Sequence, residues 1–125
     1  MRILADTHIV YWLFYEPHKL PSAARTILDD ADAVFVSAVS LWEIAIKVRV
    51  GKLKADLPEL LASIEAANLL ELPVLARHTP LVSTLPLYHA DPFDRLLIAQ
   101  AISENLHLLT ADPHLQQYSE LVIQV

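Results

Sequence analysis

The chain has 125 residues and no cysteine, which excludes disulfides, thiolate metal sites and a cysteine nucleophile. Nine basic and 15 acidic residues give a net charge of −6, which argues weakly against a polyanionic partner. This length suits one domain with a substantial core, so we expect a single domain over residues 1–125.

The expected elements alternate between short apolar strands and helices. Strand-like runs fall at residues 2–5, 33–37, 69–73, 106–110 and 121–125, and helical patterns at 7–15, 22–30, 38–50, 58–67, 74–84 and 92–105. This alternation predicts an α/β domain built on a mainly parallel sheet. Gly51 suits the end of the helix over 38–50.

Apolar content is high for a small protein, at 54% hydrophobic residues and a mean hydropathy of +0.39. We expect apolar surface that meets a partner, although a sheet covered on both faces also needs many core residues. The start MRILAD reaches a charge at Asp6 too soon for a secretory signal, and the most apolar stretch stops at Glu43. We therefore expect a cytoplasmic protein without a membrane span.

Three aspartates stand where strands end or helices begin. Asp6 directly follows the first strand, and Asp112 follows the strand over 106–110. In HADPFDRLLIAQA, Asp91 is an expected N-cap, Pro92 fits the first helical position, and Asp94 lies in the first turn. Each aspartate taken singly is explained as a cap. A parallel sheet would bring these loops to one edge, where ligands bind.

Glu43 is harder to explain as a surface residue. It lies in SAVSLWEIAIKV, a helix with almost no polar face, and such a helix is buried. A buried carboxylate is costly unless it is paired or coordinated. An ion pair with Lys47, four residues on, is the alternative, worth about 0.2–0.5 kcal/mol on an exposed helix.

Clustered carboxylates raise one another's pKa unless a cation compensates them, and Mg²⁺ or Mn²⁺ prefers oxygen ligands. Such a site suits hydrolysis of phosphate esters and needs no protein nucleophile. Thr7 and Thr110 could orient the ligands, although capping explains them as well. The six histidines receive no role, although His89 and His114 flank the acidic motifs.

Basic residues offer candidate contacts to RNA phosphates, with a solvated helix end as an equal alternative. They are Lys47, Arg49, Lys52 and Lys54 in KVRVGKLK, and Arg95 beside Asp94, where it could instead neutralise the acidic site.

The order and spacing of LADTHIVYWL, SAVSLWEIAIKVRVGKL, HADPFDRLLIAQA and LLTAD resemble those of PIN-domain ribonucleases, and more narrowly of VapC-type toxins. The resemblance covers nearly the whole chain. It implies a three-layer α/β/α fold with four to five strands, and endonucleolytic cleavage of RNA with Mg²⁺ or Mn²⁺. Carried over by motif, the acids are Asp6, Glu43, Asp94 and Asp112, while Asp91 is a cap that could approach the metal.

The resemblance also implies inhibition by a cognate antitoxin, in a prokaryotic cytoplasm. From the apolar composition we expect a homodimer that binds the antitoxin over the acidic site. Two alternatives remain. A receiver-type phosphoacceptor would need a second acid beside Asp6 and an acceptor aspartate after a middle strand, and both are missing. A non-catalytic module that binds RNA or a partner would be excluded by metal-dependent turnover.

Overall fold

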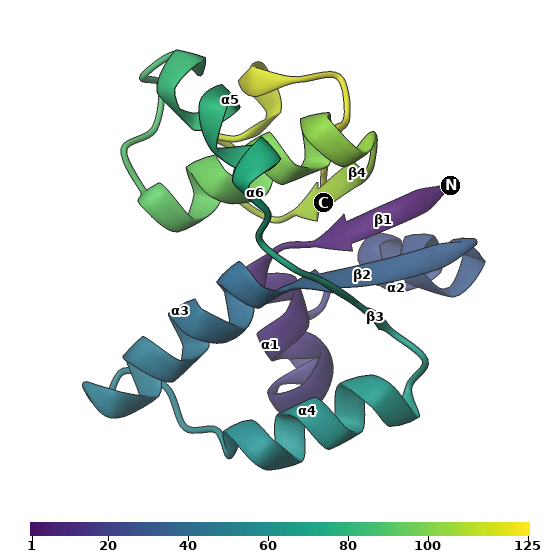
Figure 1. Cartoon of the computed structure of the whole chain (residues 1–125). Coiled ribbons are helices and arrows are strands. Elements are labelled where there is room, and N and C mark those ends of the chain that lie inside the picture. Colours follow the sequence, from purple (N-terminus) through teal and green to yellow (C-terminus); the bar gives the residue numbers. More distant parts are fainter.

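Five parallel strands form one sheet in the computed structural model, which describes residues 1–125 (Figure 1). Their order across the sheet is β3-β2-β1-β4-β5. The strands are β1 (Arg2–Ala5), β2 (Ala33–Ser37), β3 (Leu70–Leu72), β4 (His107–Thr110) and β5 (Val122–Gln124). In register, Leu4 of β1 lies between Phe35 of β2 and Leu108 of β4. The expectation of a mainly parallel sheet is confirmed.

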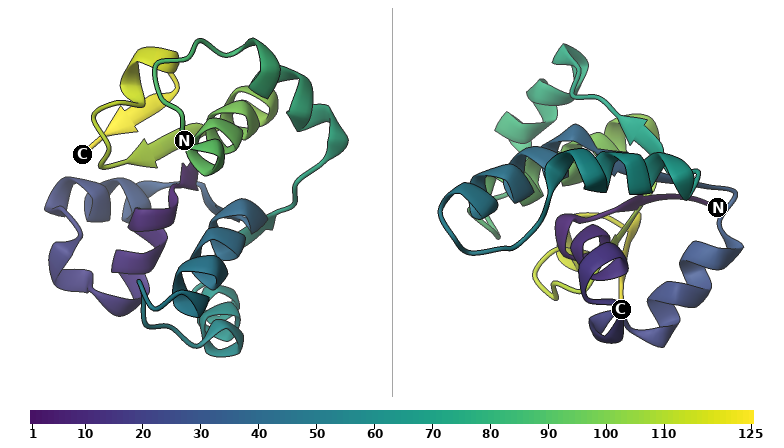
Figure 2. Two further views of the ribbon diagram at one scale, coloured as in Figure 1. Left: turned by 90° about the vertical axis from the view of Figure 1, so that its left-hand side faces the viewer. Right: turned by 90° about the horizontal axis from the view of Figure 1, so that it is seen from below.

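Helices cover both faces of this sheet and create two separate cores (Figure 2). The helices are α1 (Thr7–Tyr15), α2 (Ser22–Asp30), α3 (Ala38–Arg49), α4 (Leu57–Ala66), α5 (Thr79–Thr84) and α6 (Pro92–Glu104). Side chains alternate along a strand, so Ile3 and Ala5 pack toward α1, α2 and α4, whereas Leu4 packs toward α6. With helices on both faces of the sheet, the fold has three layers in the order α/β/α, as expected. No helix is long and apolar enough to cross a lipid bilayer.

The segment before α6 departs most from the expected pattern. We expected one helix over 74–84, but a single 3-10 turn at Ala76–His78 leads into the six-residue α5. Pro80 lacks an N–H and stands in the first turn of α5, so a regular helix cannot continue through it from residue 74. Gly51 ends α3 as expected, with φ at +80°, a conformation that favours glycine.

The strand order places a topological switch beside β1. From β1 the chain builds the sheet outward through β2 and β3, then crosses back to add β4 and β5 on the other side of β1. In such sheets the crevice outside the carboxyl ends of the two strands at the switch is the usual ligand site. Asp6 and Asp112 leave the sheet at that place, after β1 and β4.

Candidate functional site

Asp6 serves as a helix cap and also belongs to the acidic site. Its Oδ1 accepts a hydrogen bond from the Ile9 N–H at 3.0 Å, which caps α1. Its Oδ2 accepts a hydrogen bond from the Thr110 hydroxyl at the end of β4. Burial raises the pKa of Asp6, and the negative charge of Glu43 acts in the same direction, although these hydrogen bonds oppose the rise.

Asp91 and Asp94 have different roles at the start of α6: Asp91 caps the helix, and Asp94 faces His89. Asp91 accepts the N–H groups of Phe93 and Asp94 at 2.8 and 3.1 Å, so the predicted N-cap is confirmed. Asp94 Oδ2 lies 2.9 Å from His89 Nε2. Burial raises the pKa of Asp94 to about 6; the hydrogen bond to His89 opposes this, and the charges of Asp91, Asp6 and Glu43 add to it.

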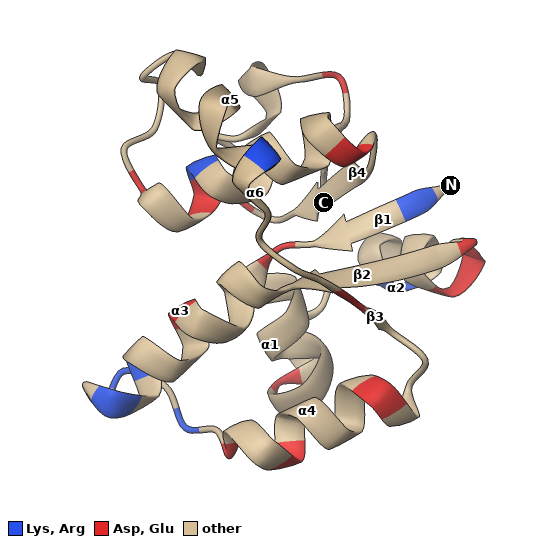
Figure 3. Ribbon diagram, viewed as in Figure 1, with Lys and Arg blue, Asp and Glu red and all other residues tan.

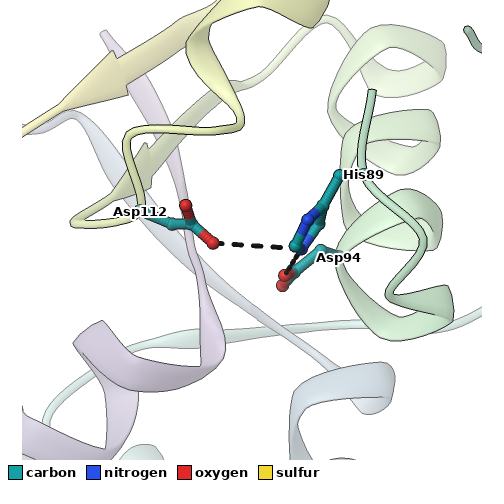
Figure 4. Close-up of side chains that lie close together, drawn as sticks. All are labelled: His89, Asp94 and Asp112. Carbon is teal, nitrogen blue, oxygen red and sulfur yellow. Dashed lines mark hydrogen bonds and ion pairs between the residues drawn. The ribbon is translucent and has the colours of Figure 1, made fainter. Parts of the chain in front are cut away.

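Asp112 reaches the same place from the loop after β4, and His89 lies between it and Asp94 (Figure 4). Asp112 Oδ2 is 3.9 Å from His89 Nε2, while Oδ1 accepts the His114 N–H at 2.8 Å and lies 2.9 Å from His114 Nδ1. Burial alone would raise the pKa of Asp112, but the hydrogen bonds and charge of His114, with the charge of His89, lower it.

Glu43 is the fourth acid, and it is buried in α3 as its sequence context predicted. Its Oε2 pairs with Lys47 Nζ at 2.8 Å, so the predicted ion pair is present, but the Glu43 side chain is only 5% exposed. The other oxygen, Oε1, is buried and has no hydrogen-bond partner. Its charge raises the pKa of both Asp6 and Asp94, so it lies near both carboxyl groups. An unpaired buried carboxylate oxygen is costly and marks a place where a cation would be stabilised.

The two threonines expected to support the acids behave differently. Thr110 donates to Asp6, and its oxygen accepts the Asp112 N–H at 3.0 Å, so it links two of the acids. Thr7 instead donates to Ser40 at 3.0 Å and ties α1 to α3. A hollow of about 230 Å³ opens beside the acids, and its lining includes Asp6 and Asp112.

Arg95 is not placed to contact RNA or to neutralise the acids, which corrects the expectation from sequence. It is buried, and its guanidinium donates to backbone carbonyls that precede α6. These are Val82 at 2.8 Å, Leu85 at 3.1 Å, Pro86 at 2.8 Å and His89 at 3.3 Å. A position beside Asp94 in the sequence gave no signal of this, because adjacent helix residues point in different directions.

The other basic residues gather at the C-terminal end of α3 and in the loop that follows it (Figure 3). Arg49, Lys52 and Lys54 are exposed, whereas Lys47 is half-buried and paired with Glu43. The basic group therefore begins one helical turn beyond the acidic site.

His89 and Tyr118 belong to the site although sequence reasoning assigned them no role. The Tyr118 hydroxyl accepts the His89 N–H at 2.7 Å and so fixes the backbone that presents the imidazole. The position of His89 beside an acidic motif was a usable signal. Tyr118 gave none, because it lies 29 residues away in a short 3-10 turn at Gln116–Tyr118.

The fold and the site together define a parallel α/β protein with acidic side chains at the carboxyl ends of its central strands. Residues 3–121 match the family model of the PIN domain. The chain is also 31% identical over 121 residues to Ribonuclease VapC22 of Mycobacterium tuberculosis, an alignment that covers 93% of this chain and 91% of that protein. The chain therefore belongs to the PIN-domain family, which leaves the receiver-type alternative without support.

Solved structures agree on the fold. VapBC2 of Rickettsia felis, in a structure bound to a promoter DNA fragment, contains a chain that matches with a TM-score of 0.73 at 20% identity, over 99% of this chain and 98% of that one. FitAcB of Neisseria gonorrhoeae matches with a TM-score of 0.67 at 17% identity, over 98% and 96%. At such identities the likeness establishes the fold alone.

Proposed function

We propose that this protein is a divalent-metal-dependent endoribonuclease of the VapC type, with residues 1–125 acting as one nuclease domain. The observation that carries the proposal is the convergence of four carboxyl groups at the switch point of the sheet, one of which has a buried oxygen without a partner. The 31% identity to a VapC ribonuclease supports the reaction class.

The residues present fit a hard divalent cation. All four acids offer carboxylate oxygens, the ligands preferred by Mg²⁺ and Mn²⁺. The raised pKa of Asp6 and of Asp94 indicates surplus negative charge and burial that a cation would offset. Asp6 and Asp94 are the primary proposed ligands, and Glu43 and Asp112 would act directly or through water. Asp91 is the last candidate, because its side chain caps α6.

When bound, such an ion supplies the activation of water and the charge stabilisation that phosphodiester hydrolysis requires. The surrounding residues hold the carboxylates in place. The Ile9 N–H and the Thr110 hydroxyl fix the two oxygens of Asp6, His89 holds Asp94, and His114 holds Asp112. Groups held in this way lose little freedom when they bind a cation and a phosphate.

RNA would follow the basic residues beyond the acidic site. Arg49 and Lys52 are exposed at the end of α3, and Lys47 lies between them and Glu43. Lysine and arginine bind phosphates without reading base sequence, so these contacts would add affinity rather than selectivity. Their attraction for RNA also opposes the repulsion expected from the net charge of −6.

A cognate antitoxin is the proposed protein partner, with a homodimer of this chain as the toxin unit. The likeness to the VapBC2 complex supports the antitoxin, and the homodimer rests on the apolar composition of the chain. Exposed apolar side chains are available for contacts with the antitoxin or a second copy of the chain, because Trp42 is 60% exposed and Leu87 is 85% exposed. A cognate peptide that binds without reducing cleavage would contradict antitoxin binding over the acidic site.

The proposal is tested by cleavage of a panel of structured RNAs, including transfer RNAs, with Mg²⁺, Mn²⁺ or EDTA. Asp94→Asn removes a proposed ligand, and Asp56→Asn, at the exposed N-cap of α4, is the matched control because asparagine also caps helices. We expect metal-dependent cleavage that Asp94→Asn abolishes and Asp56→Asn retains.

Two outcomes would overturn this proposal. Metal binding without cleavage of any RNA would favour the alternative of a non-catalytic RNA-binding or partner-binding module. Equal loss of activity in both variants, with both folded, would mean that the loss does not come from removing a metal ligand.

A further inference from the structure

We propose that His89, Asp94 and Asp112 bind a divalent transition ion such as Zn²⁺, and that the His89 imidazole makes this part of the site discriminate such ions from Mg²⁺. One ligand atom from each of the three residues lies within 4.8 Å of the others (Figure 4). The inference rests on the proposed function in one respect, since Asp94 and Asp112 are shared with the proposed nuclease site.

Contacts to the main chain of His89 fix the position from which its imidazole reaches the carboxylates. The His89 N–H donates to the Tyr118 hydroxyl at 2.7 Å, and its carbonyl accepts from Arg95 at 3.3 Å. Arg95 and Tyr118 come from α6 and from the 3-10 turn before β5, so two elements fix the segment that carries His89. A ligand fixed in this way loses little conformational freedom on binding a metal.

Both carboxylates lie near the imidazole, and Asp94 is the nearer. Asp94 Oδ2 is 2.9 Å from His89 Nε2, and Asp112 Oδ2 is 3.9 Å from the same nitrogen. The other oxygen of Asp112 is occupied by the backbone N–H and the ring of His114. Oδ2 of Asp112 is therefore left facing His89 and Asp94, as a ligand must.

A second feature is a buried carboxylate oxygen that has no partner and whose charge acts on Asp94. Glu43 Oε1 is buried without a hydrogen-bond partner, although Lys47 pairs with the other oxygen of Glu43. The charge of Glu43 acts on Asp94, and Arg95 donates to carbonyls instead of neutralising the acids. A divalent cation would offset this negative charge.

The donor set decides which cation is favoured. An imidazole nitrogen suits zinc, copper, iron and nickel, whereas Mg²⁺ prefers oxygen ligands and retains water. One histidine with two carboxylates gives Zn²⁺ three protein ligands and leaves a position open. Because Asp94 and Asp112 serve both sites, Zn²⁺ bound here would compete with Mg²⁺ bound by the four acids.

The test measures direct binding of Zn²⁺ and of Mg²⁺ by the full chain at one fixed pH, by competition with a chromophoric chelator for Zn²⁺ and by calorimetry for Mg²⁺. The variant is His89→Gln, which keeps a polar side chain but removes the imidazole. His18→Gln, in the exposed turn after α1, is the matched control. We expect His89→Gln to weaken Zn²⁺ binding by about tenfold or more beyond any loss of Mg²⁺ binding, and His18→Gln to alter neither.

An equal loss of affinity for both ions would overturn the inference, because His89 would then only orient Asp94. Failure of the natural protein to bind Zn²⁺ more tightly than Mg²⁺ would also overturn it. Thermal melting without metal checks that the variant folds, and His89→Asn replaces it if it does not. RNA cleavage with Mg²⁺ is scored separately, so the nuclease proposal can stand when this one fails.

Discussion

The Thr110 hydroxyl donates a hydrogen bond to Asp6 Oδ2, although 104 residues separate the two in the chain. The same hydroxyl oxygen accepts the Asp112 N–H at 3.0 Å. Because β1 and β4 are neighbours in the sheet, one side chain connects an acid that follows each strand. Thr110 therefore sets the relative position of two acids that no local motif relates.

Replacing Thr110 by valine should lower the free energy of unfolding by about 1–3 kcal/mol, because a buried carboxylate oxygen and a partly buried N–H each lose a partner while the shape is kept. The pKa of Asp6 should rise further, since this hydrogen bond lowers it. Urea unfolding measures the stability. Thr26→Val, at an exposed position on α2, is the control and should change stability by less than about 0.5 kcal/mol. Similar losses in both variants would contradict this role.

Without metal, Asp94→Asn should stabilise the protein at neutral pH. The pKa of Asp94 is about 6 in the folded protein against an ordinary value of 3.8, so the folded state holds this proton more tightly than the unfolded chain. As the pH rises through this interval the unfolded chain ionises first, and the folded state loses stability. Asparagine does not ionise. The variant should exceed the natural protein by about 1–3 kcal/mol at pH 7.5 and by little at pH 4.

Urea unfolding in EDTA at several pH values between 4 and 7.5 checks this prediction. The informative quantity is the difference between the two proteins, because other groups that titrate over the same range contribute to both. A variant that is less stable at pH 7.5 would mean that Asp94 gains more from its hydrogen bond to His89 than it loses by burial. A difference that stays constant down to pH 4 would mean that folding does not raise the pKa of Asp94.

The sequence predicted those parts of the site that depend on local rules. The N-caps at Asp6 and Asp91 follow from residue type beside a helix pattern, and both are present. The burial of Glu43 followed from the apolar residues around it on α3. The sheet was predictable because short apolar runs alternate with helices.

The other features of the site depend on tertiary contacts, which the helix and strand periodicity of the sequence does not reveal. Residues 85–91, between α5 and α6, have no regular structure, so nothing in their pattern indicated that His89 turns back toward Asp94. Arg95 holds that segment from within, whereas its charged type suggested an outward position. Pro80 also shortened the helix that was expected over residues 74–84. These residues lie where tertiary packing overrides local preference.

Glu43→Gln should lower the pKa of Asp94 below its value of about 6, because the negative charge of Glu43 contributes to the rise. Burial is the larger cause and is unchanged, so the pKa should stay above the ordinary value. Carboxyl carbon chemical shifts measured in a pH titration without metal give the answer. Glu65→Gln, at an exposed position on α4, is the control and should leave Asp94 unchanged. An unchanged Asp94 in the Glu43 variant would show that these two groups do not interact.

Arg95→Met should destabilise the protein by about 3 kcal/mol, since it removes a buried guanidinium that donates to the carbonyls of Val82, Leu85 and Pro86. Amide hydrogen exchange should speed up over residues 82–91, where those carbonyls lie. Arg77→Met is the matched control, because the Arg77 side chain pairs with Glu104 at an exposed position, and it should cost less than about 1 kcal/mol. A stable Arg95 variant with weaker RNA binding would instead return Arg95 to the phosphate-contacting role that its burial argues against.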